Sequence, residues 1–331
     1  MSRRTGFLLA FCAGAGVLAG CAQMQSSPES TQTVKVTPLG SHDGEFCPLD
    51  RALVFEDPDG TRILYDAGRT VRGPNDPRLG KIDALLLSHV HGDHLGDLIQ
   101  PSANAGACPK PDFSVNVAPN SNMVNISLGK QAPMIVGGEM GSFLAAKVKT
   151  LGGDPGKLVR LVRFGAQTMV GKVMVAAVPA VHSNGLPPAF LPPEQARLFE
   201  AAGLTAYVGE PGGFVLRFSN GLTAYLSGDT GITAEQDLVV RGHYKANLVV
   251  MNVGGFPFTT GPAESAYVVN ELVRPNSVIV SHANEPATVG GKVAPNSKTA
   301  AFQNAAKMPV HVPLSGRTMQ FDGSGRCVSG C

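Results

Sequence analysis

The chain has 331 residues, of which 43% are hydrophobic, and its 27 Lys and Arg residues nearly balance its 25 Asp and Glu residues. This length allows one α/β domain or two, and the apolar fraction is large enough for a sizeable core. The near-neutral charge argues against a nucleic-acid partner, which would need a basic face, so we expect no nucleic-acid binding.

The first twenty residues have the pattern of an export signal. Arg3 and Arg4 precede an apolar stretch, residues 7–18, that is too short to span a bilayer comfortably. The following Leu18-Ala19-Gly20-Cys21 resembles a bacterial lipobox, which predicts a lipoprotein signal peptide over residues 1–20 and an acylated Cys21. An ordinary signal peptide and an uncleaved anchor are the alternatives.

The residues after the cysteine bear on location. Ala22 at this position resembles Gram-negative lipoproteins of the outer membrane. We therefore expect a lipid-anchored protein of the cell envelope, on the outer membrane and facing the periplasm. Residues 21–33, rich in Ser and Gln, are predicted to form a polar tether between the anchor and the folded part.

Strands begin after the tether. Residues 52–56 and 61–66 flank Asp57-Pro58-Asp59-Gly60, whose residue types are typical of a tight turn, so we expect a β-hairpin. Residues 82–87 form an apolar run of strand length. The chain is then expected to turn at Gly92 and to open a helix over residues 95–99.

The turn after that strand contains a cluster of metal-binding side chains. His89, His91, Asp93 and His94 lie within six positions, which hold three of the chain's eight histidines. Residues two apart in an extended backbone point to the same side, so His89 and His91 can bind one cation, while Asp93 and His94 can face a second position. Imidazole and carboxylate are ligands of zinc and similar metals, so His-x-His-x-Asp-His after a buried strand predicts a metal site.

Three further apolar strands end in a candidate ligand. Residues 173–181 lead to His182, and residues 277–280 lead to His282. Residues 214–218 and 222–226 form a predicted hairpin whose second strand leads to Asp229. Because strand ends that meet along one edge of a sheet form a site, we expect these side chains to join the first cluster.

The other segments surround these strands. Residues 100–130 are expected to be an irregular insertion, residues 132–136 and 247–252 strands, and residues 143–149, 262–274 and 297–308 helices, the last with Ser297 as its N-cap. The proline-rich stretch 186–193 directly follows His182. It is either a wall of the substrate pocket or a loop packed on a neighbouring helix.

The metal motif resembles that of the metallo-β-lactamase superfamily, and most of all its ascorbate-6-phosphate lactonase-like branch. Gly209-Glu210-Pro211-Gly212-Gly213-Phe214 and the glycine-rich residues 254–261 add to the resemblance. It implies a mixed α/β (α+β) fold, a four-layer αββα sandwich that forms one hydrolase domain over residues 34–321. Residues 322–331 would then be a cysteine-containing tail beyond the last strand. Asp66, in a segment that resembles the family's Asp-Thr-Gly, would support the site or the structure and not bind metal.

Carried over residue by residue, the resemblance implies two divalent metal ions. His89, His91 and His182 would hold one, Asp93, His94 and His282 would hold the other, and Asp229 would bridge them. We expect Zn²⁺, with Mn²⁺ and Fe²⁺ as alternatives. Two such ions about 3.5–4 Å apart share a water, lower its pKa and polarise the substrate's oxygen. Asp93 is also the candidate catalytic residue that takes up a proton as the intermediate collapses.

The expected function is a metal-dependent hydrolase that uses a metal-bridging hydroxide on an ester, a lactone or a related bond. The substrate would be a small molecule or a lipid. The alternatives are a phospholipase D-like phosphodiesterase acting on membrane lipid and a non-catalytic metal-binding envelope lipoprotein. Candidate substrate contacts are Phe258, Thr259 and Asn284. Because Ala283-Asn284-Glu285 after His282 departs from the family's pattern, the substrate itself is not carried over, and the sequence does not indicate the oligomeric state.

Four cysteines remain once Cys12 leaves with the signal and Cys21 carries lipid. In an exported chain, Cys47, Cys108, Cys327 and Cys331 predict two disulfides, with three pairings open. A soft-metal site is the alternative, and we prefer disulfides because the histidines already account for a metal.

Overall fold

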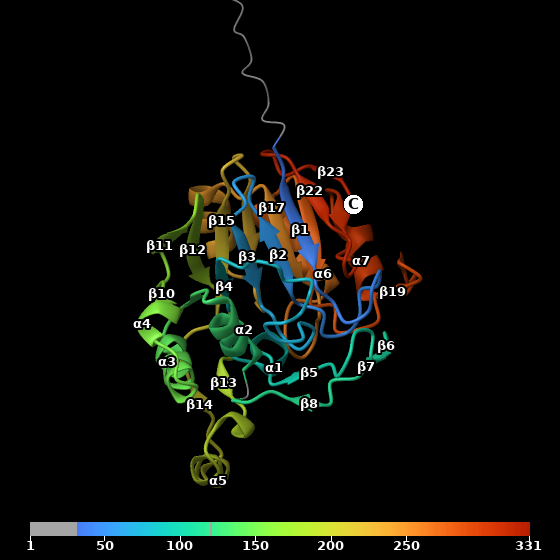
Figure 1. The fold of residues 1–331 in the computed structure, drawn as a ribbon. Helices are drawn as coiled ribbons and strands as arrows, with labels where there is room; N and C mark the ends of the chain where they lie inside the picture. The colour runs from blue at the N-terminus through green and yellow to red at the C-terminus, as the bar shows by residue number, and fades with distance from the viewer. Residues whose placement is uncertain (1–31, 120) are drawn as a thin grey trace, which may run out of the picture.

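The computed structural model describes residues 32–119 and 121–331 (Figure 1). The expected signal peptide, the expected lipidation site Cys21 and nearly all of the expected tether lie outside the described residues. Within the described ranges, no helix is both long enough and apolar enough to cross a bilayer.

Two sheets lie face to face at the centre of the molecule (Figure 1). The first has the strand order β10 (Val159–Leu161), β9 (Met134–Val136), β4 (Ala84–Leu86), β3 (Arg62–Tyr65), β2 (Leu53–Glu56), β1 (Val34–Pro38), β22 (Met319–Phe321) and β23 (Cys327–Ser329). The second has the order β11 (Gln167–Val170), β12 (Val173–Pro179), β15 (Gly212–Arg217), β16 (Thr223–Leu226), β17 (Leu248–Asn252), β18 (Ser277–Ser281) and β21 (Val310–His311). Side chains of both sheets, such as Phe55 and Phe214, form one buried cluster between them.

Helices cover the outer face of each sheet. On the first sheet lie α2 (Asn122–Lys130), α3 (Met140–Thr150) and α4 (Pro155–Leu158), packed through a cluster that includes Leu85 and Leu144. On the second lie η2 (Gln236–Tyr244), α6 (Pro262–Tyr267), its continuation η3 (Val268–Val273) and α7 (Lys298–Ala305), packed through a cluster that includes Val249 and Phe302. The expected four-layer αββα sandwich in one domain is confirmed.

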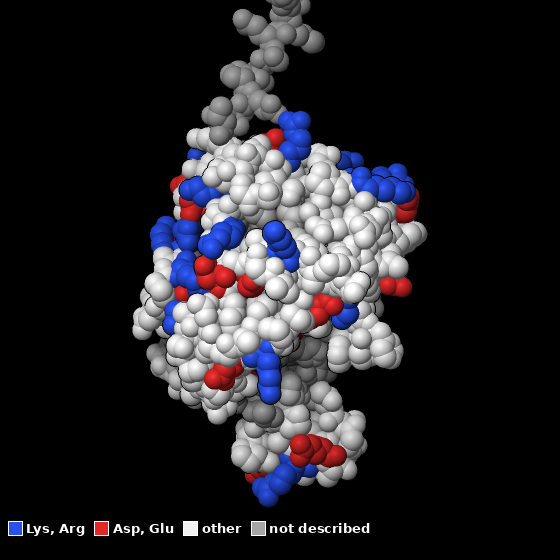
Figure 2. Space-filling view, turned by 90° about the vertical axis from the view of Figure 1, so that its right-hand side faces the viewer, with Lys and Arg blue, Asp and Glu red and all other residues white. Residues whose placement is uncertain are grey.

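Shorter elements occupy the loops. They are α1 (Gly92–Leu95), η1 (Pro188–Phe190), α5 (Pro193–Ala202), β5 (Leu98–Ile99), β6 (Gly106–Ala107), β7 (Lys110–Pro111), β8 (Val115–Asn116), β13 (Gly185–Leu186), β14 (Ala206–Tyr207), β19 (Thr288–Val289) and β20 (Lys292–Val293). The β13–α5–β14 excursion extends beyond the sandwich at its lower end in Figure 1. Lys and Arg side chains are interspersed with Asp and Glu on the face drawn in Figure 2.

The surroundings of strand β12 show why the sequences of the central strands are continuously apolar. Val173 and Val175 pack between the two sheets, whereas Met174 and Ala176 pack towards the helices on the second sheet. Both faces of the strand are therefore buried, and a polar residue has no solvent-facing position to occupy.

The turn after β4 differs from the prediction. The helix expected over residues 95–99 is instead α1, Gly92–Leu95, and Leu98–Ile99 form β5, which pairs with β8. Gly96 ends α1 in the left-handed conformation, with φ at 82°, and its N–H donates to the Gly92 carbonyl. Asp93 and His94 consequently lie within a helical turn and not in the loop before it.

Two other predictions need correction. The insertion expected over residues 100–130 is not irregular throughout, because α2 begins at Asn122 with the Ser121 hydroxyl accepting the Val124 N–H. At the other end of the chain, β23 pairs with β22, so the first sheet continues into residues that were expected to lie beyond the last strand.

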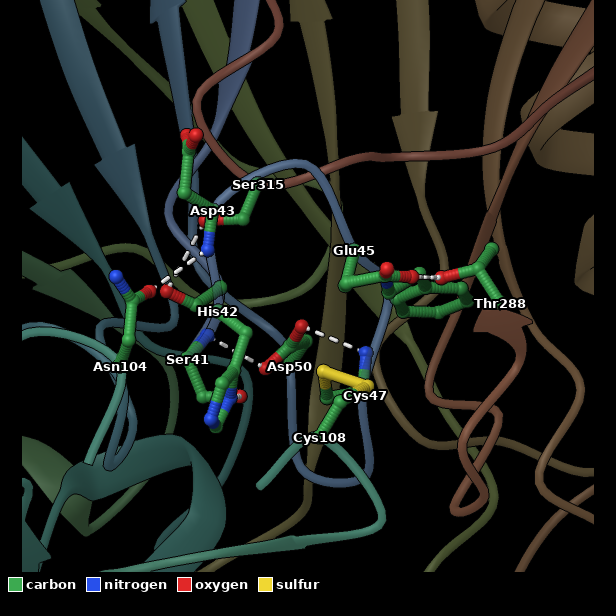
Figure 3. The surroundings of a disulfide bond; sticks show 12 residues. Ser41, His42, Asp43, Glu45, Cys47, Asp50, Asn104, Cys108, Thr288 and Ser315 are labelled. Atoms are coloured by element: carbon green, nitrogen blue, oxygen red, sulfur yellow. Dashed lines mark hydrogen bonds between the residues drawn. A yellow bond between two sulfur atoms is a disulfide. The ribbon is translucent and has the colours of Figure 1, made fainter. Parts of the chain in front are cut away.

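Both expected disulfides are present. Cys47 pairs with Cys108, and Cys327 pairs with Cys331. Beside the first disulfide (Figure 3), the buried Asp50 carboxylate accepts the N–H groups of Ser41 at 2.9 Å and Cys47 at 2.8 Å. Burial raises the pKa of Asp50 to about 6. The segment that precedes Arg51 is thereby fixed both covalently and by hydrogen bonds.

Candidate metal centre

The predicted ligands meet at one edge of the sandwich. Strands β16, β17 and β18 are parallel, and β12 runs in the same direction because β12 and β16 are both antiparallel to β15. The carboxyl ends of β12, β16 and β18 therefore lie at the same edge, where the chain continues into His182, Asp229 and His282. The turn after β4 brings the first cluster to this edge from the other sheet, so the site lies where the two sheets meet.

His89, His91 and His182 form the first group of potential ligands. Nδ1 of His91 lies 3.0 Å from Nε2 of His89 and 3.3 Å from Nε2 of His182, and one ligand atom from each lies within 4.8 Å of the others. Burial lowers the pKa of His89 well below its ordinary value. Burial and the neighbouring His182 lower the pKa of His91 to about 4. These imidazoles are therefore neutral at pH 7, which is the form that binds zinc.

Asp93, His94 and His282 form the second group. Nε2 of His94 and Nε2 of His282 each lie 3.6 Å from Oδ2 of Asp93. Burial by itself would lower the pKa of His94, but the carboxylates of Asp229, Asp93 and Asp66 raise it to about 10. Binding of a divalent cation here would therefore displace a proton from His94.

Asp229 lies against both groups. Its Oδ2 is 2.8 Å from Nε2 of His282 and 3.7 Å from Nε2 of His182, and its Oδ1 is 3.4 Å from Nε2 of His94. Burial would raise the pKa of Asp229, but His282 and His94 hold it well below the usual range. An ionised carboxylate thus faces ligand atoms of both groups, where a bridging ligand would lie.

The side chains present fit a pair of divalent ions. Among the described buried side chains, His94 Nε2 and Asp229 Oδ1 have no hydrogen-bond partner, although they face each other across 3.4 Å. Leaving buried polar atoms unsatisfied costs free energy, and a cation between them would satisfy both. Two triads of imidazole and carboxylate donors that share one further carboxylate are suited to borderline metals such as zinc.

Asp66 supports this arrangement from behind. Its Oδ2 accepts a hydrogen bond from the Ser88 hydroxyl at 2.7 Å and lies 2.8 Å from Nδ1 of His94, while its Oδ1 accepts the Ser88 N–H at 2.9 Å. With Nδ1 held by this carboxylate, Nε2 of His94 is the nitrogen directed at Asp229. The position agrees with the supporting role expected for Asp66.

We expect Asp66→Asn to weaken metal binding by about 10- to 100-fold, because a carboxamide no longer fixes the protonated nitrogen of His94. Chelator-competition titration would measure the loss. The matched control is Asp57→Asn, since Asp57 also accepts the N–H and the hydroxyl of one serine, Ser219, at 2.8 Å and 2.7 Å. Equal losses of metal affinity in the two variants would contradict the assigned role.

Arg51 is a site residue that the sequence reasoning missed. Its buried guanidinium donates to Oδ2 of Asp93 from Nε at 3.2 Å and from Nη2 at 3.0 Å, and Nη2 also donates to Oδ1 of Asn284 at 2.5 Å. Nδ2 of Asn284 in turn lies 3.3 Å from Nδ1 of His282. No local motif surrounds Arg51 in the sequence, so only the tertiary fold reveals this network around the second group.

A cleft of about 820 Å³ opens over both groups. Beside the ligands, its walls include Arg69, Lys298, Phe258 and Asn284, so two of the three candidate substrate contacts line it. The third, Thr259, lines an adjoining groove instead. Asn284 has the additional contacts to Arg51 and His282, which the sequence did not indicate.

The proline-rich stretch 186–193 packs into the protein. Leu186 and Phe190 are buried in the cluster beneath the helices of the first sheet, and the Lys147 ammonium of α3 lies 6.0 Å from the Phe190 ring centroid. The cleft walls do not include this stretch. Of the two readings, packing against a neighbouring helix is therefore correct.

Comparison with known proteins also indicates a metal-dependent hydrolase. Residues 61–283, which include all seven predicted ligands, match the Beta-lactamase superfamily domain. The chain is 30% identical over 280 residues to a UPF0173 metal-dependent hydrolase of Cupriavidus necator, covering 80% of this chain and 81% of that protein. It is 28% identical over 273 residues to a similarly named protein of Thermodesulfovibrio yellowstonii, covering 81% and 88%.

A solved structure shares the fold. The metallo hydrolase Igni18 from Ignicoccus hospitalis superposes with a TM-score of 0.56 at 20% identity, covering 88% of this chain and 99% of that one. The family match, the sequence relatives and the ligand geometry agree, and the chain belongs to the UPF0173 metal-dependent hydrolases of the β-lactamase superfamily.

Proposed function

We propose that this chain is a dinuclear, zinc-dependent hydrolase that cleaves an ester, a lactone or a related bond. The observation that supports this proposal is the pair of ligand groups that share Asp229, with one Asp229 oxygen facing His94 and the other facing His282. The resemblance to the ascorbate-6-phosphate lactonase-like branch suggests the type of bond. It does not suggest the substrate, because the residues after His282 depart from that branch.

The residues of the chain prepare the site for this chemistry. When bound, two divalent ions lower the pKa of a water and polarise the substrate's oxygen. Asp66 holds Nδ1 of His94, so that Nε2 would be free to bind an ion, and Arg51 orients the Asp93 carboxylate. Burial would raise the pKa of Asp93, but His94 and Arg51 hold it well below its usual range. A carboxylate held ionised is a weak proton acceptor, so we assign Asp93 the role of a metal ligand in preference to that of a proton acceptor.

Metal analysis of the purified mature chain, loaded with zinc, manganese or iron, tests this proposal together with a hydrolysis screen. We expect two ions per chain and turnover of at least one ester or lactone. His91→Ala should weaken the first ion. His311→Ala should leave both ions, because His311 lies outside both groups, near the disulfide-bonded Cys327 and Cys331. A wild-type chain that binds no metal under any loading condition would exclude the proposal.

Two other functions are separated by the same screen. A phosphodiesterase acting on membrane lipid is favoured by the exposed rings of Phe256 and Phe258 beside the cleft, and it would hydrolyse the phosphodiesters and not the esters. A chain that binds two ions but hydrolyses none of the lactones, esters, thioesters, β-lactams or phosphodiesters would be a metal-binding envelope lipoprotein without catalysis.

We infer from residues 18–21 that the mature chain begins at an acylated Cys21. Mass spectrometry of the membrane fraction would test this, and an unmodified cysteine or a different first residue would refute it. Strand β1 begins at the end of the sandwich opposite to α1 (Figure 1). A chain anchored through its N-terminus would thus carry its cleft at the end away from the attachment point.

A further inference from the structure

A group of exposed apolar side chains lies beside the metal cleft. Phe256 is 96% exposed, Phe258 64% and Val181 60%, and Ile232 is 46% exposed. With Pro257, these residues form what we call the apolar shelf. A contiguous group of exposed large apolar side chains indicates a binding site for a ligand or a partner, because exposing apolar surface to water costs free energy.

The shelf continues from the cleft. Its residues line a groove of about 460 Å³, which also includes Thr259 and Glu264. Phe256 and Phe258 line both this groove and the cleft over the metal ligands. Val181 directly precedes His182, and His182 and Phe258 line the same cleft. The shelf therefore adjoins the first group of ligands.

Buried hydrogen bonds fix the loop that holds the two rings. Nδ2 of Asn252 donates to the Thr260 hydroxyl at 2.8 Å. The Ser265 hydroxyl donates to the Asn252 carbonyl at 2.7 Å, and its oxygen lies 2.9 Å from the Thr260 hydroxyl oxygen. At the base of the loop, the Gly255 N–H donates to the Thr260 carbonyl at 3.1 Å. The exposed rings are thus held on a loop whose two ends are anchored.

We propose that the apolar shelf binds an acyl chain of the substrate, while the bond to be cleaved lies over the metal ligands. This inference rests on the proposed hydrolase function. A substrate group is favoured over a membrane surface because the shelf shares two of its walls with the cleft, so a molecule held at the ligands extends directly onto it.

Straight-chain alkyl hydroxamates provide a probe that does not depend on turnover, because the hydroxamate head binds divalent metals and the alkyl chain varies in length. We would titrate acetohydroxamate to decanohydroxamate into the zinc-loaded mature chain by calorimetry. In the wild type, affinity should rise about two- to threefold per added methylene, somewhat less than for full burial of each group. The slope should flatten in the double variant Phe256→Ser, Phe258→Ser.

The control is Val289→Ser, which replaces an apolar side chain that is 74% exposed on β19 and should leave the slope unchanged. Metal content is measured for every variant, so that a lost ion is not mistaken for a lost contact.

Two outcomes would overturn the inference while leaving the hydrolase proposal intact. One is a slope in the double variant equal to that of the wild type, and the other is no dependence of affinity on chain length in the wild type. If the chain-length slope is absent and vesicles of phosphatidylglycerol bind the wild type but not the double variant, the shelf binds a membrane surface and the inference is overturned. A wild type that takes up no zinc and does not bind acetohydroxamate would overturn the metal centre and the inference with it.

Discussion

Asp229→Ala should release the second metal ion and reduce hydrolysis by at least about 100-fold. Loss of an outer partner of a metal ligand already costs about 10- to 100-fold, and Asp229 is placed to bind directly. Two dications at close range repel each other, and a shared carboxylate offsets that repulsion. The second ion should be lost first, because Asp229 lies nearer to the ligands of the second group, 2.8 Å from His282 and 3.4 Å from His94, than to His182 of the first, at 3.7 Å.

Metal content by mass spectrometry and hydrolysis of the best substrate measure this result. His311→Ala serves as the control and should retain two ions and full activity. Because the buried His94 would lose an anionic partner 3.4 Å away, urea unfolding of each variant shows whether the fold itself survives. An Asp229→Ala chain with two tightly bound ions and full activity would show that the ligand assignment is wrong.

Arg51→Met should destabilise the metal-free protein by about 3 kcal/mol, because the Asp93 carboxylate would lose its buried cationic partner. Side chains of the pair are only 2% and 20% exposed, so solvent screens the interaction little. In the metal-loaded protein the loss should be smaller, since a bound dication compensates the same carboxylate. The dependence on metal distinguishes a site residue from a structural one.

The pH dependence has a definite sign. The folded-state pKa of Asp93 lies below its unfolded value of 3.8, so the stability from its pairing is complete at pH 7 and is lost as the pH falls below 3.8 through the folded pKa. Urea unfolding at pH 7 and at a pH below 3.8, each with and without metal, measures both effects. The control is Arg78→Met, which breaks an ion pair with buried Asp76 away from the cleft and should cost the same in both states. Equal losses for Arg51→Met with and without metal would contradict its link to the ligands.

Much of the site could be predicted because ligands follow strands that are apolar enough to recognise. The turns after β4, β12, β16 and β18 bring seven side chains together as the pattern indicated. Helix α1 was misplaced because its start at Gly92 lies inside the histidine motif, where no Ser, Thr, Asp or Asn occupies the N-cap position. Arg51 could not be predicted at all, since its role depends on contacts with Asp93 and Asn284 that are remote in sequence.

The solvent exposure of aromatic side chains in loops could not be predicted from the hydrophobic pattern of the sequence either. Phe190 and Phe256 both lie in proline-containing loops after a ligand-bearing or buried strand, yet Phe190 is 6% exposed and Phe256 is 96% exposed. Whether a ring packs inward depends on which helix lies nearby, here α3 for Phe190. That information is tertiary, and the local sequences do not distinguish the two cases.

The position of the ligands between the sheets has a consequence for the lifetime of the protein. His91 and Asp93 come from the first sheet, while His182 and His282 follow strands of the second, so each bound ion would join the two halves of the sandwich as a removable cross-link. Free energy of metal binding would then be free energy of folding. The metal-free chain would be the form most open to proteolysis, and the supply of metal would set how much of the protein accumulates.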